Sequence, residues 1–329
     1  MKDARRWLSL ALLAPLLLFI LPTQAGGLLS IQSENNSWAG TEDGHFTNGS
    51  EIRWIFPPVE SHWTNGLAAL LPGWTANDVD QAAYRLGHQI YTPINLSATS
   101  LQEDDRPYAG LLYAGLSLAN SQTHEGWRES RGLHLDLGLV GPVAGAAKTQ
   151  RYFHRFIAGD EPRGWSHQLN NEPIIAIGYE HAWLKQGHWG GMELEYGPTT
   201  GFSLGNLFTY ATAGITMRYG KGLDTTYNIT SIDPAQDVQI FGQSGGKFRW
   251  YVFAGLEGRY MAHNLLLDGN SYTASHSVER EPWVGDAKAG FAFEWDRWQM
   301  TYTMIWRSEE FSQQEHPDRF GSLSLSLRL

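Results

Sequence analysis

The end of the chain shows the simplest pattern of apolar and polar residues. From Ser322 to Leu329, leucine occupies every second position, and serine or arginine occupies the positions between. A period of two predicts a β-strand with one apolar face and one polar face. Such a strand suits the wall of a membrane β-barrel, where one face meets lipid and the other meets the lumen.

The same alternation recurs along the chain and predicts twelve strands. They are expected at about 28–36, 49–57, 82–93, 107–121, 130–141, 174–185, 188–197, 207–219, 247–261, 284–295, 298–308 and 319–329. Bacterial single-chain barrels have an even number of antiparallel strands. The pattern therefore predicts an all-β fold, a twelve-stranded antiparallel transmembrane β-barrel.

The connections between strands follow from the strand order. If both termini are periplasmic, the connections after odd strands are extracellular, at 37–48, 94–106, 142–173, 198–206, 262–283 and 309–318. Connections after even strands should then be short turns, as they are at 186–187 and 296–297. Those at 58–81 and 220–246 are long, so either they hold small periplasmic elements or the strand count is wrong there.

Composition narrows the setting of these strands. Beyond the first residues, no apolar run approaches the ~20 residues that a membrane helix needs. Aromatic residues make up 13% of the chain and glycine occupies 36 positions, and a β-rich chain that enters a membrane must form a closed barrel. The absence of cysteine excludes disulfides, and a net charge of −10 argues against nucleic acid as a partner.

The first residues have the composition of an export signal. A short basic stretch precedes an apolar run from Trp7 to Leu21, and a small-residue cleavage site ends at Ala25. An Arg-Arg pair also fits a twin-arginine signal, but a barrel must be exported unfolded, which favours an ordinary signal peptide. The chain is thus divided into a signal peptide, 1–25, and a barrel, 26–329. A soluble β-sandwich would explain the alternation but not the export signal and the terminal strand together.

Carboxylates, amides and hydroxyls gather around the first outward connection. Glu34, Asn35 and Asn36 precede it, and Thr47 follows it. Asn48 and Gly49 form a hairpin signal, so a polar turn is the simplest interpretation of this segment.

The connection 142–173 contains a predicted helix from Gly145 to Ala158. Gln150 and His154 lie four residues apart in it and therefore share one face. Three basic residues flank this pair, namely Lys148, Arg151 and Arg155. Basic residues at the outer leaflet suit an anionic lipid headgroup, and a solvated helix face is the alternative.

A third polar segment runs from Leu267 to Asn270 in another outward connection. It has two interpretations, a calcium site built from oxygens or an Asp-Gly turn, and the turn is favoured. Strand parity also places the polar segment around Asn35 and Thr47 at the same end as Gln150, His154 and Asp160. Loops that converge on one rim favour a membrane hydrolase.

Taken in order, these segments resemble the lipid A 3′-O-deacylase family. Each motif is weak alone, but about ten of them in the same order, over nearly the whole chain after the signal peptide, are specific. The matching segments are Glu34-Asn35-Asn36, Gly40-Thr41, Phe46-Thr47-Asn48-Gly49, Gln89-Ile90-Tyr91-Thr92-Pro93, Asp105-Arg106-Pro107-Tyr108-Ala109-Gly110, Gly141-Pro142, Gln150 with His154, Gly164-Trp165 with Gln168, Gly205-Asn206 and Leu267-Asp268-Gly269-Asn270.

The resemblance implies a twelve-stranded barrel, monomeric, in the outer membrane of a Gram-negative bacterium. Its implied activity is calcium-dependent hydrolysis of the ester that holds the 3′-linked acyloxyacyl chain of lipid A in lipopolysaccharide. By position, His154 corresponds to the catalytic base and Gln150 to its neighbour in the site. Asn35 and Thr47 match polar site residues, and Asp160 aligns with an acidic one. The basic residues that flank Gln150 and His154 would hold the lipid A phosphates.

One position departs from the family. The first motif typically reads Asn-Asp, and here Asn36 occupies the second position. The resemblance implies that this aspartate is a calcium ligand. An asparagine is neutral and therefore a weaker oxygen donor to calcium. By period-two parity, Glu34 points to the same face as Asn36 and would supply the missing charge. Glu34, Asn36 and Asp160 are therefore the expected calcium ligands.

Two other functions remain open from the sequence. A membrane phospholipase with a serine nucleophile would need a serine beside a histidine on neighbouring strands, and no such pair is evident. A catalytically inactive structural or lipid-binding barrel is the other possibility, and its support is Asn36.

Overall fold

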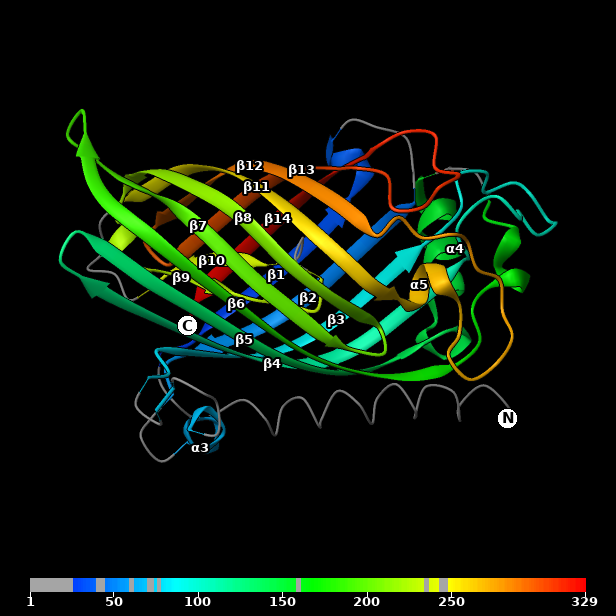
Figure 1. Cartoon of the computed structure of the whole chain (residues 1–329), viewed down its shortest axis with the longest axis horizontal. Coiled ribbons are helices and arrows are strands. Elements are labelled where there is room, and N and C mark those ends of the chain that lie inside the picture. The colour runs from blue at the N-terminus through cyan, green and yellow to red at the C-terminus, as the bar shows by residue number, and fades with distance from the viewer. Residues whose placement is uncertain are drawn as a thin grey trace.

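The computed structural model describes residues 26–39, 45–58, 62–69, 74–75, 78–157, 161–233, 237–242 and 248–329. Twelve of the described strands form a closed antiparallel barrel (Figure 1). They are β1 (Leu28–Asn35), β2 (Phe46–Phe56), β3 (Gln81–Tyr91), β4 (Ala109–His124), β5 (Trp127–Val140), β6 (Glu172–Trp189), β7 (Met192–Gly205), β8 (Phe208–Lys221), β11 (Arg249–Asn264), β12 (Trp283–Trp295), β13 (Trp298–Arg307) and β14 (Asp318–Arg328). The twelve-stranded prediction is confirmed, and the predicted signal peptide 1–25 lies outside the described residues.

The terminal strand closes the barrel as its alternation predicted. β14 pairs with β1 from Leu28 opposite Arg328 to Asn35 opposite Gly321. The serines of β14 are buried on the lumen side, whereas Leu325 is 49% exposed on the outside. Each strand has side chains on alternate faces, so the polar face lines the lumen and the apolar face forms the outer wall.

The two ends of the barrel differ in their connections. We call the end where β1, β3, β5, β7, β11 and β13 finish the loop end, and the opposite end the turn end. The loop end carries η1 (Asn36–Ala39), η2 (Pro142–Ala144), α4 (Ala146–Ile157), η3 (Gly164–His167) and α5 (Leu265–Asp268). Among the described residues, no helix is long and apolar enough to cross a membrane.

Two predicted connections are wrong in position. The connection expected at 198–206 is mostly strand, because β7 continues to Gly205 and only two residues separate it from β8. The turn expected at 186–187 lies at Gly190 and Gly191, which both have positive φ values, 57° and 79°. Two adjacent glycines adopt the left-handed turn that a tight hairpin requires, so this signal marks the turn better than the strand pattern did.

The long connection after β8 folds back into the barrel. It contains η4 (Leu223–Thr225), β9 (Thr226–Ile229) and β10 (Val238–Phe241), and the last two pair as a separate ribbon. Gln299 holds the ribbon to the wall, because its amide accepts from the Phe241 N–H (3.2 Å) and donates to the Phe241 carbonyl (3.0 Å). The described part of the 220–246 connection is therefore a lumen element, and the count of wall strands is right.

Buried ion pairs also occupy the lumen. Arg85 donates to Glu51 (3.1 Å) and to Asp136 (2.6 Å), and all three side chains are inaccessible to solvent. Arg128 and Arg218 share the Glu195 carboxylate in the same way. Opposite charges pair because a buried charge without a partner is costly. The first group connects β2, β3 and β5, and the second connects β5, β7 and β8.

Candidate active site

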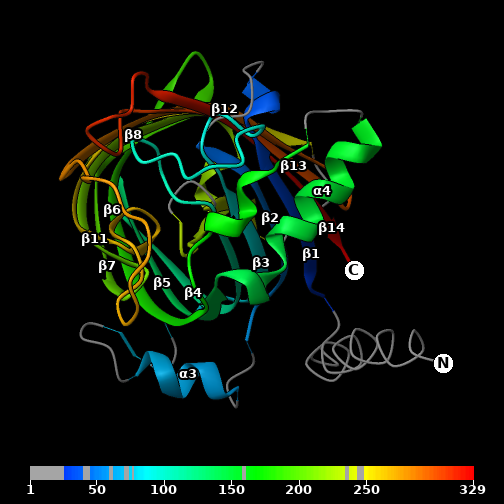
Figure 2. The ribbon, with the colours of Figure 1, turned by 90° about the vertical axis from the view of Figure 1, so that its right-hand side faces the viewer.

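Helix α4 lies against the outer wall at the loop end. Ala146, its first residue, packs with Ile90 of β3, and the side chain of His88 lies 3.1 Å from the carbonyl oxygen of Ala144. His88 and Ile90 alternate along β3 with lumen-facing Gln89, so they belong to the outer face. Figure 2 shows α4 along the rim of the barrel, away from its axis.

Two glycines allow this close packing. Gly145 has a φ of 78°, which lets the chain turn from η2 into α4. A Cβ at Gly110 of β4 would lie 2.5 Å from the Cβ of Ala146. The predicted helix from Gly145 to Ala158 is thus confirmed as α4, and its first turn is seated directly on the wall.

Gln150 and His154 lie on the buried face of α4. Both are almost inaccessible, with exposed fractions of 2% and 5%. The indole N–H of Trp165 in η3 donates to Oε1 of Gln150 at 2.8 Å. The Gln150 Nε2 is buried and has no hydrogen-bond partner among the described residues. The amide therefore presents a free donor beside the imidazole.

The Trp165 side chain is itself held by Tyr108. Their ring centroids lie 4.9 Å apart with the planes tilted by 54°, and both residues belong to one apolar cluster with Ile90 and Ala146. This cluster anchors η3 to the wall, so the orientation of the Gln150 amide is determined by packing that reaches β3.

The predicted basic residues share another face of α4. Lys148 and Arg155 are exposed and Arg151 is half-buried, and their spacing places all three on one stripe. Tyr152 and Phe153 beside them are exposed by 78% and 52%. The outward side of α4 therefore combines positive charge with two aromatic rings, as expected of a helix at a membrane surface.

Asn35 and Thr47 contact each other on the neighbouring strands. The Asn35 Nδ2 donates to the Thr47 carbonyl at 2.7 Å, and the hydroxyls of Thr47 and Thr92 are 2.7 Å apart. Thr92 follows β3 directly, and Ile90 at the end of β3 contacts Ala146 of α4. The Asn35–Thr47 pair and α4 therefore flank the same end of β3.

Of the three expected calcium ligands, the structure describes the surroundings of Glu34 most fully. Glu34 points into the lumen, where its carboxylate accepts from Gln32 at 2.8 Å, and Oε2 has no hydrogen-bond partner in the described part of the chain. The strand alternation that assigned Glu34 and Asn36 to one face ends at Asn35, because Asn36 begins η1. Asp160 lies outside the described residues. Glu34 is thus separated from α4 by the barrel wall.

The segment from Leu267 to Asn270 forms the end of α5 and a turn. Asp268 lies 3.1 Å from Arg280 and 3.0 Å from His263. Burial raises the pKa of Asp268, but the His263 hydrogen bond and the Arg280 charge outweigh burial and lower it. A carboxylate that already serves two cationic partners is a poor calcium ligand, and Gly269, with a φ of 83°, makes the turn.

His45 joins three loops at the loop end and was not singled out in the sequence. Its ring nitrogens lie 3.0 Å from Asp318 and 3.5 Å from Asp105. Burial lowers the pKa of His45, but the two carboxylates outweigh burial and raise the pKa to about 9. An isolated histidine in a polar loop gives no signal in the sequence, because its partners are distant in the chain.

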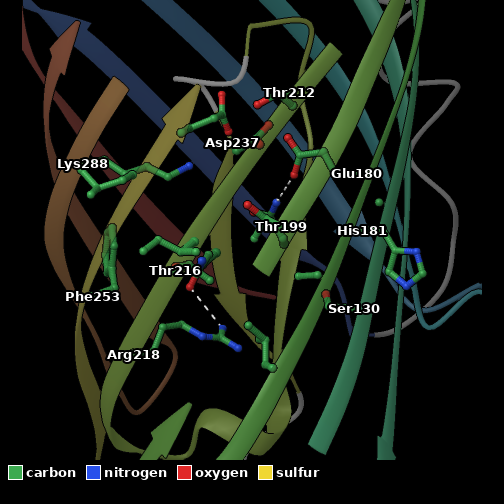
Figure 3. A pocket seen from close by; sticks show the side chains of 18 of the residues that line it. Ser130, Glu180, His181, Thr199, Thr212, Thr216, Arg218, Asp237, Phe253 and Lys288 are labelled. Carbon is green, nitrogen blue, oxygen red and sulfur yellow. Dashed lines mark hydrogen bonds between the residues drawn. The ribbon is translucent and has the colours of Figure 1, made fainter. Parts of the chain in front are cut away.

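A cavity of about 110 Å³ lies inside the barrel, between the ribbon and the wall. Figure 3 shows Glu180, Asp237 and Lys288 on its lining. The amide of Asn228 on the ribbon donates to Glu180 at 3.0 Å. This cavity belongs to the lumen and is therefore on the other side of the wall from α4.

Comparisons with known proteins agree with this architecture. The sequence model of the family described as outer membrane protein LpxR matches residues 8–329. The chain belongs to the LpxR family. LpxR from Salmonella typhimurium has a similar structure, with a TM-score of 0.75 at 18% identity, over 91% of this chain and 99% of that one. The β domain of the Bordetella autotransporter BrkA reaches a TM-score of 0.46 at 8% identity, over 93% of this chain and 99% of that one.

LpxR membership confirms the expected family, barrel and location. As an LpxR-family protein, the chain is an outer-membrane β-barrel of the Gram-negative type. No curated protein sequence matches it. At 18% identity, the Salmonella LpxR structure establishes the fold, and the roles of individual residues rest on the geometry described above.

Proposed function

We propose that this protein hydrolyses the ester bond of the 3′-linked acyloxyacyl chain of lipid A at the outer face of the barrel. LpxR-family membership supports an outer-membrane lipid A deacylase. The observation that carries the assignment is the Gln150–His154 pair, a free amide donor beside an imidazole on a helix seated against the lipid-facing wall. Such a site is reached from the membrane and not from the lumen.

The proposed reaction uses an activated water. The His154 imidazole takes the proton from water, because a neutral imidazole nitrogen can act as a general base. The Gln150 Nε2 donates to the carbonyl oxygen as negative charge develops on it. Asn35 and Thr47 supply polar groups on the opposite side of the β3 end. The water oxygen bonds to the acyl carbon, the bond between that carbon and the 3′ oxygen of the sugar breaks, and His154 passes the proton to the departing alkoxide oxygen.

The substrate is held by charge and by apolar contact together. The stripe of Lys148, Arg151 and Arg155 binds the lipid A phosphates, since guanidinium and ammonium groups pair with phosphate oxygens. Tyr152 and Phe153 lie in the acyl region beside this stripe. The loop end then faces the outer leaflet, where lipopolysaccharide is located, and the turn end faces the periplasm.

Calcium is expected from the resemblance, and the described residues fit it poorly. They contain no group of three or more acidic or histidine side chains that would hold a metal ion. Calcium needs several oxygen ligands, and Glu34 lies on the lumen side. When bound, calcium would polarise the ester carbonyl, with Asn36, Asp160 and substrate oxygens as its ligands. We therefore propose weak calcium binding.

The test is a lipid A product analysis. Purified protein in detergent is incubated with lipopolysaccharide, with calcium or with a chelator, and the lipid A is examined by mass spectrometry. Loss of one 3′-acyloxyacyl unit is the expected result. His154→Ala should abolish the loss while the barrel stays folded. Arg155→Ala, on the basic stripe of α4, is the matched control, which should keep turnover but raise KM.

Three outcomes would contradict the proposal in different ways. Full activity in His154→Ala removes the general-base role. Release of fatty acid from phospholipid instead of lipid A identifies a phospholipase. No product from either lipid, with a folded barrel, identifies an inactive relative, in which case Asn36→Asp is the variant that tests whether a missing carboxylate is the cause.

A further inference from the structure

The described parts of the connection between β2 and β3 lie at the turn end, and they include a short helix. Its helix α3 (Trp63–Ala68) is outside the wall in both ribbon views (Figures 1 and 2). The indole N–H of Trp63 donates to the hydroxyl of Tyr84 on β3 at 3.1 Å. Ala68, Trp74 and Val79 form one buried cluster with residues of the wall. The wall members of this cluster are Phe56, Ala82, Leu116, Leu118 and Leu133.

The wall residues in this cluster belong to the outer face. Ala83 and Ala119 alternate with Ala82 and Leu118, and both contact the β9–β10 ribbon in the lumen. Side chains alternate along a strand, so Ala82 and Leu118 point away from the lumen. Their exposed fraction is nevertheless 0%. Helix α3 together with Trp74 and Val79, called the α3 segment below, therefore covers apolar wall that would otherwise face lipid.

The exposed apolar band on the outer wall, called bare wall below, is much taller along β11 than along β4. On β11, outward residues are exposed from Val252 (45%) to Tyr260 (47%). At about 3.3 Å per residue and a tilt of about 40°, this span covers about 23 Å, close to the ~25 Å apolar band of outer-membrane barrels. The β11 side therefore matches the membrane by itself.

The β4 side does not match the membrane by itself. Leu112 and Ala114 are the only exposed apolar residues on its outer face, because Gly110 lies under α4 and Leu116 under the α3 segment. The same geometry assigns about 8 Å of bare wall to this span. Either the bilayer is thinner by about 15 Å along β4, or the α3 segment itself lies in the membrane.

We propose that α3 lies in the membrane, in the leaflet at the turn end, with the Trp63 side chain among the phospholipids. The helix carries no acidic residue in its first turn and no basic residue in its last, so no charge opposes its burial in lipid. Trp63 is 57% exposed although its indole N–H reaches the Tyr84 hydroxyl on the wall, and tryptophan prefers the membrane interface. The cost of hydrophobic mismatch rises with each ångström, so covering the wall with α3 is favoured over thinning the bilayer.

The occupant of this surface is therefore a phospholipid bilayer, continuous with the lipid that surrounds the rest of the wall. α3 and α4 cap opposite ends of the same strands, β3 and β4. The barrel then presents two helices to the membrane on one side and bare strands on the other. The orientation of the barrel in the bilayer depends on both helices.

The absence of cysteine makes a direct test possible. A single nitroxide label is attached at Trp63→Cys or at Ala69→Cys, which is exposed and keeps the Trp63 contact. The protein is reconstituted in phosphatidylcholine vesicles, and the label is examined by power saturation with oxygen and with a water-soluble nickel complex. Leu256→Cys on bare wall and Glu125→Cys in an exposed turn at the turn end are the reference positions.

The expected result is that the labels at residues 63 and 69 resemble the label at residue 256. Their oxygen accessibility should exceed their nickel accessibility, with a depth within one headgroup layer of the interface. Nickel accessibility equal to that of the residue 125 label at both positions would overturn the proposal, because α3 would then lie in water and the bilayer would have to thin along β4. The Ala69 label keeps the test valid if the Trp63 substitution disturbs the segment.

Discussion

Replacing Trp165 with phenylalanine removes one hydrogen bond and leaves an aromatic ring against Tyr108. In the intact protein, the indole N–H donates to Gln150 Oε1 at 2.8 Å, and the buried Gln150 Nε2 is left as the free donor of the site. Without the indole N–H, the buried Oε1 has lost its donor. The amide can then rotate by half a turn, which presents an acceptor to the developing oxyanion and repels it.

The magnitude follows from the cost of an unsatisfied buried acceptor. That cost is about 1–3 kcal/mol, so Trp165→Phe should lower kcat by about 5- to 150-fold. Removing the donor altogether in Gln150→Ala should cost about 10²–10³ in kcat, as at other oxyanion sites. The KM should change little in both variants, because the interaction strengthens only in the transition state.

The assay is the initial rate of 3′-acyloxyacyl release from lipopolysaccharide in detergent, with the folded state checked by heat-dependent gel mobility. The decisive comparison is a double-mutant cycle. If Trp165 acts through Gln150, then Trp165→Phe on a Gln150→Ala background should cost nothing further. A double variant that loses the product of both single effects would refute the coupling and leave Trp165 with a packing role only.

Three further predictions concern calcium and the loops. Asn36→Asp should lower the calcium concentration for half-maximal activity by at least tenfold, measured by calcium titration; an unchanged value means that residue 36 is not a ligand. His45, with its pKa raised to about 9, stabilises the loop end fully below its ordinary pKa near 6.5 and loses that stabilisation as pH rises through about 9. Protease resistance of the loops should fall over that range in the wild type, whereas His45→Asn should show a flat, lower resistance. Asp268→Asn should lower the thermal midpoint at neutral pH by a few degrees, because the ion pair with Arg280 is lost. The calcium concentration for half-maximal activity should stay the same; a higher value would restore a calcium role for that turn.

The strands could be predicted because their signal is local. In a strand, each side chain points opposite to its neighbour, so a residue such as Leu325 identifies its own lipid-facing side from the letters beside it. The same is true of α4, where the spacing of Gln150 and His154 is enough to place them on one face. Asn35 and Thr47 also follow from strand ends, since the first and second strands are adjacent.

The errors and omissions have a different physical cause. Contacts with wall strands decide whether each long connection lies inside or outside the barrel. Gln299 holds the β9–β10 ribbon inside the lumen, and Tyr84 holds α3 outside the wall. His45 gains its role only from Asp105 and Asp318, far away in the chain. Such pairings have no period that a sequence pattern can reveal.

Only the tertiary structure decided on which side of the barrel wall each predicted site residue lies. By itself the sequence determined that a polar face and an apolar face alternate around a closed barrel, because that alternation is a property of each strand. It could not tell that Gln150 is on the lipid side while Glu34 is on the lumen side. That separation depends on where a loop helix packs after the barrel closes, and the packing of Ala146 into the space above Gly110 determines it.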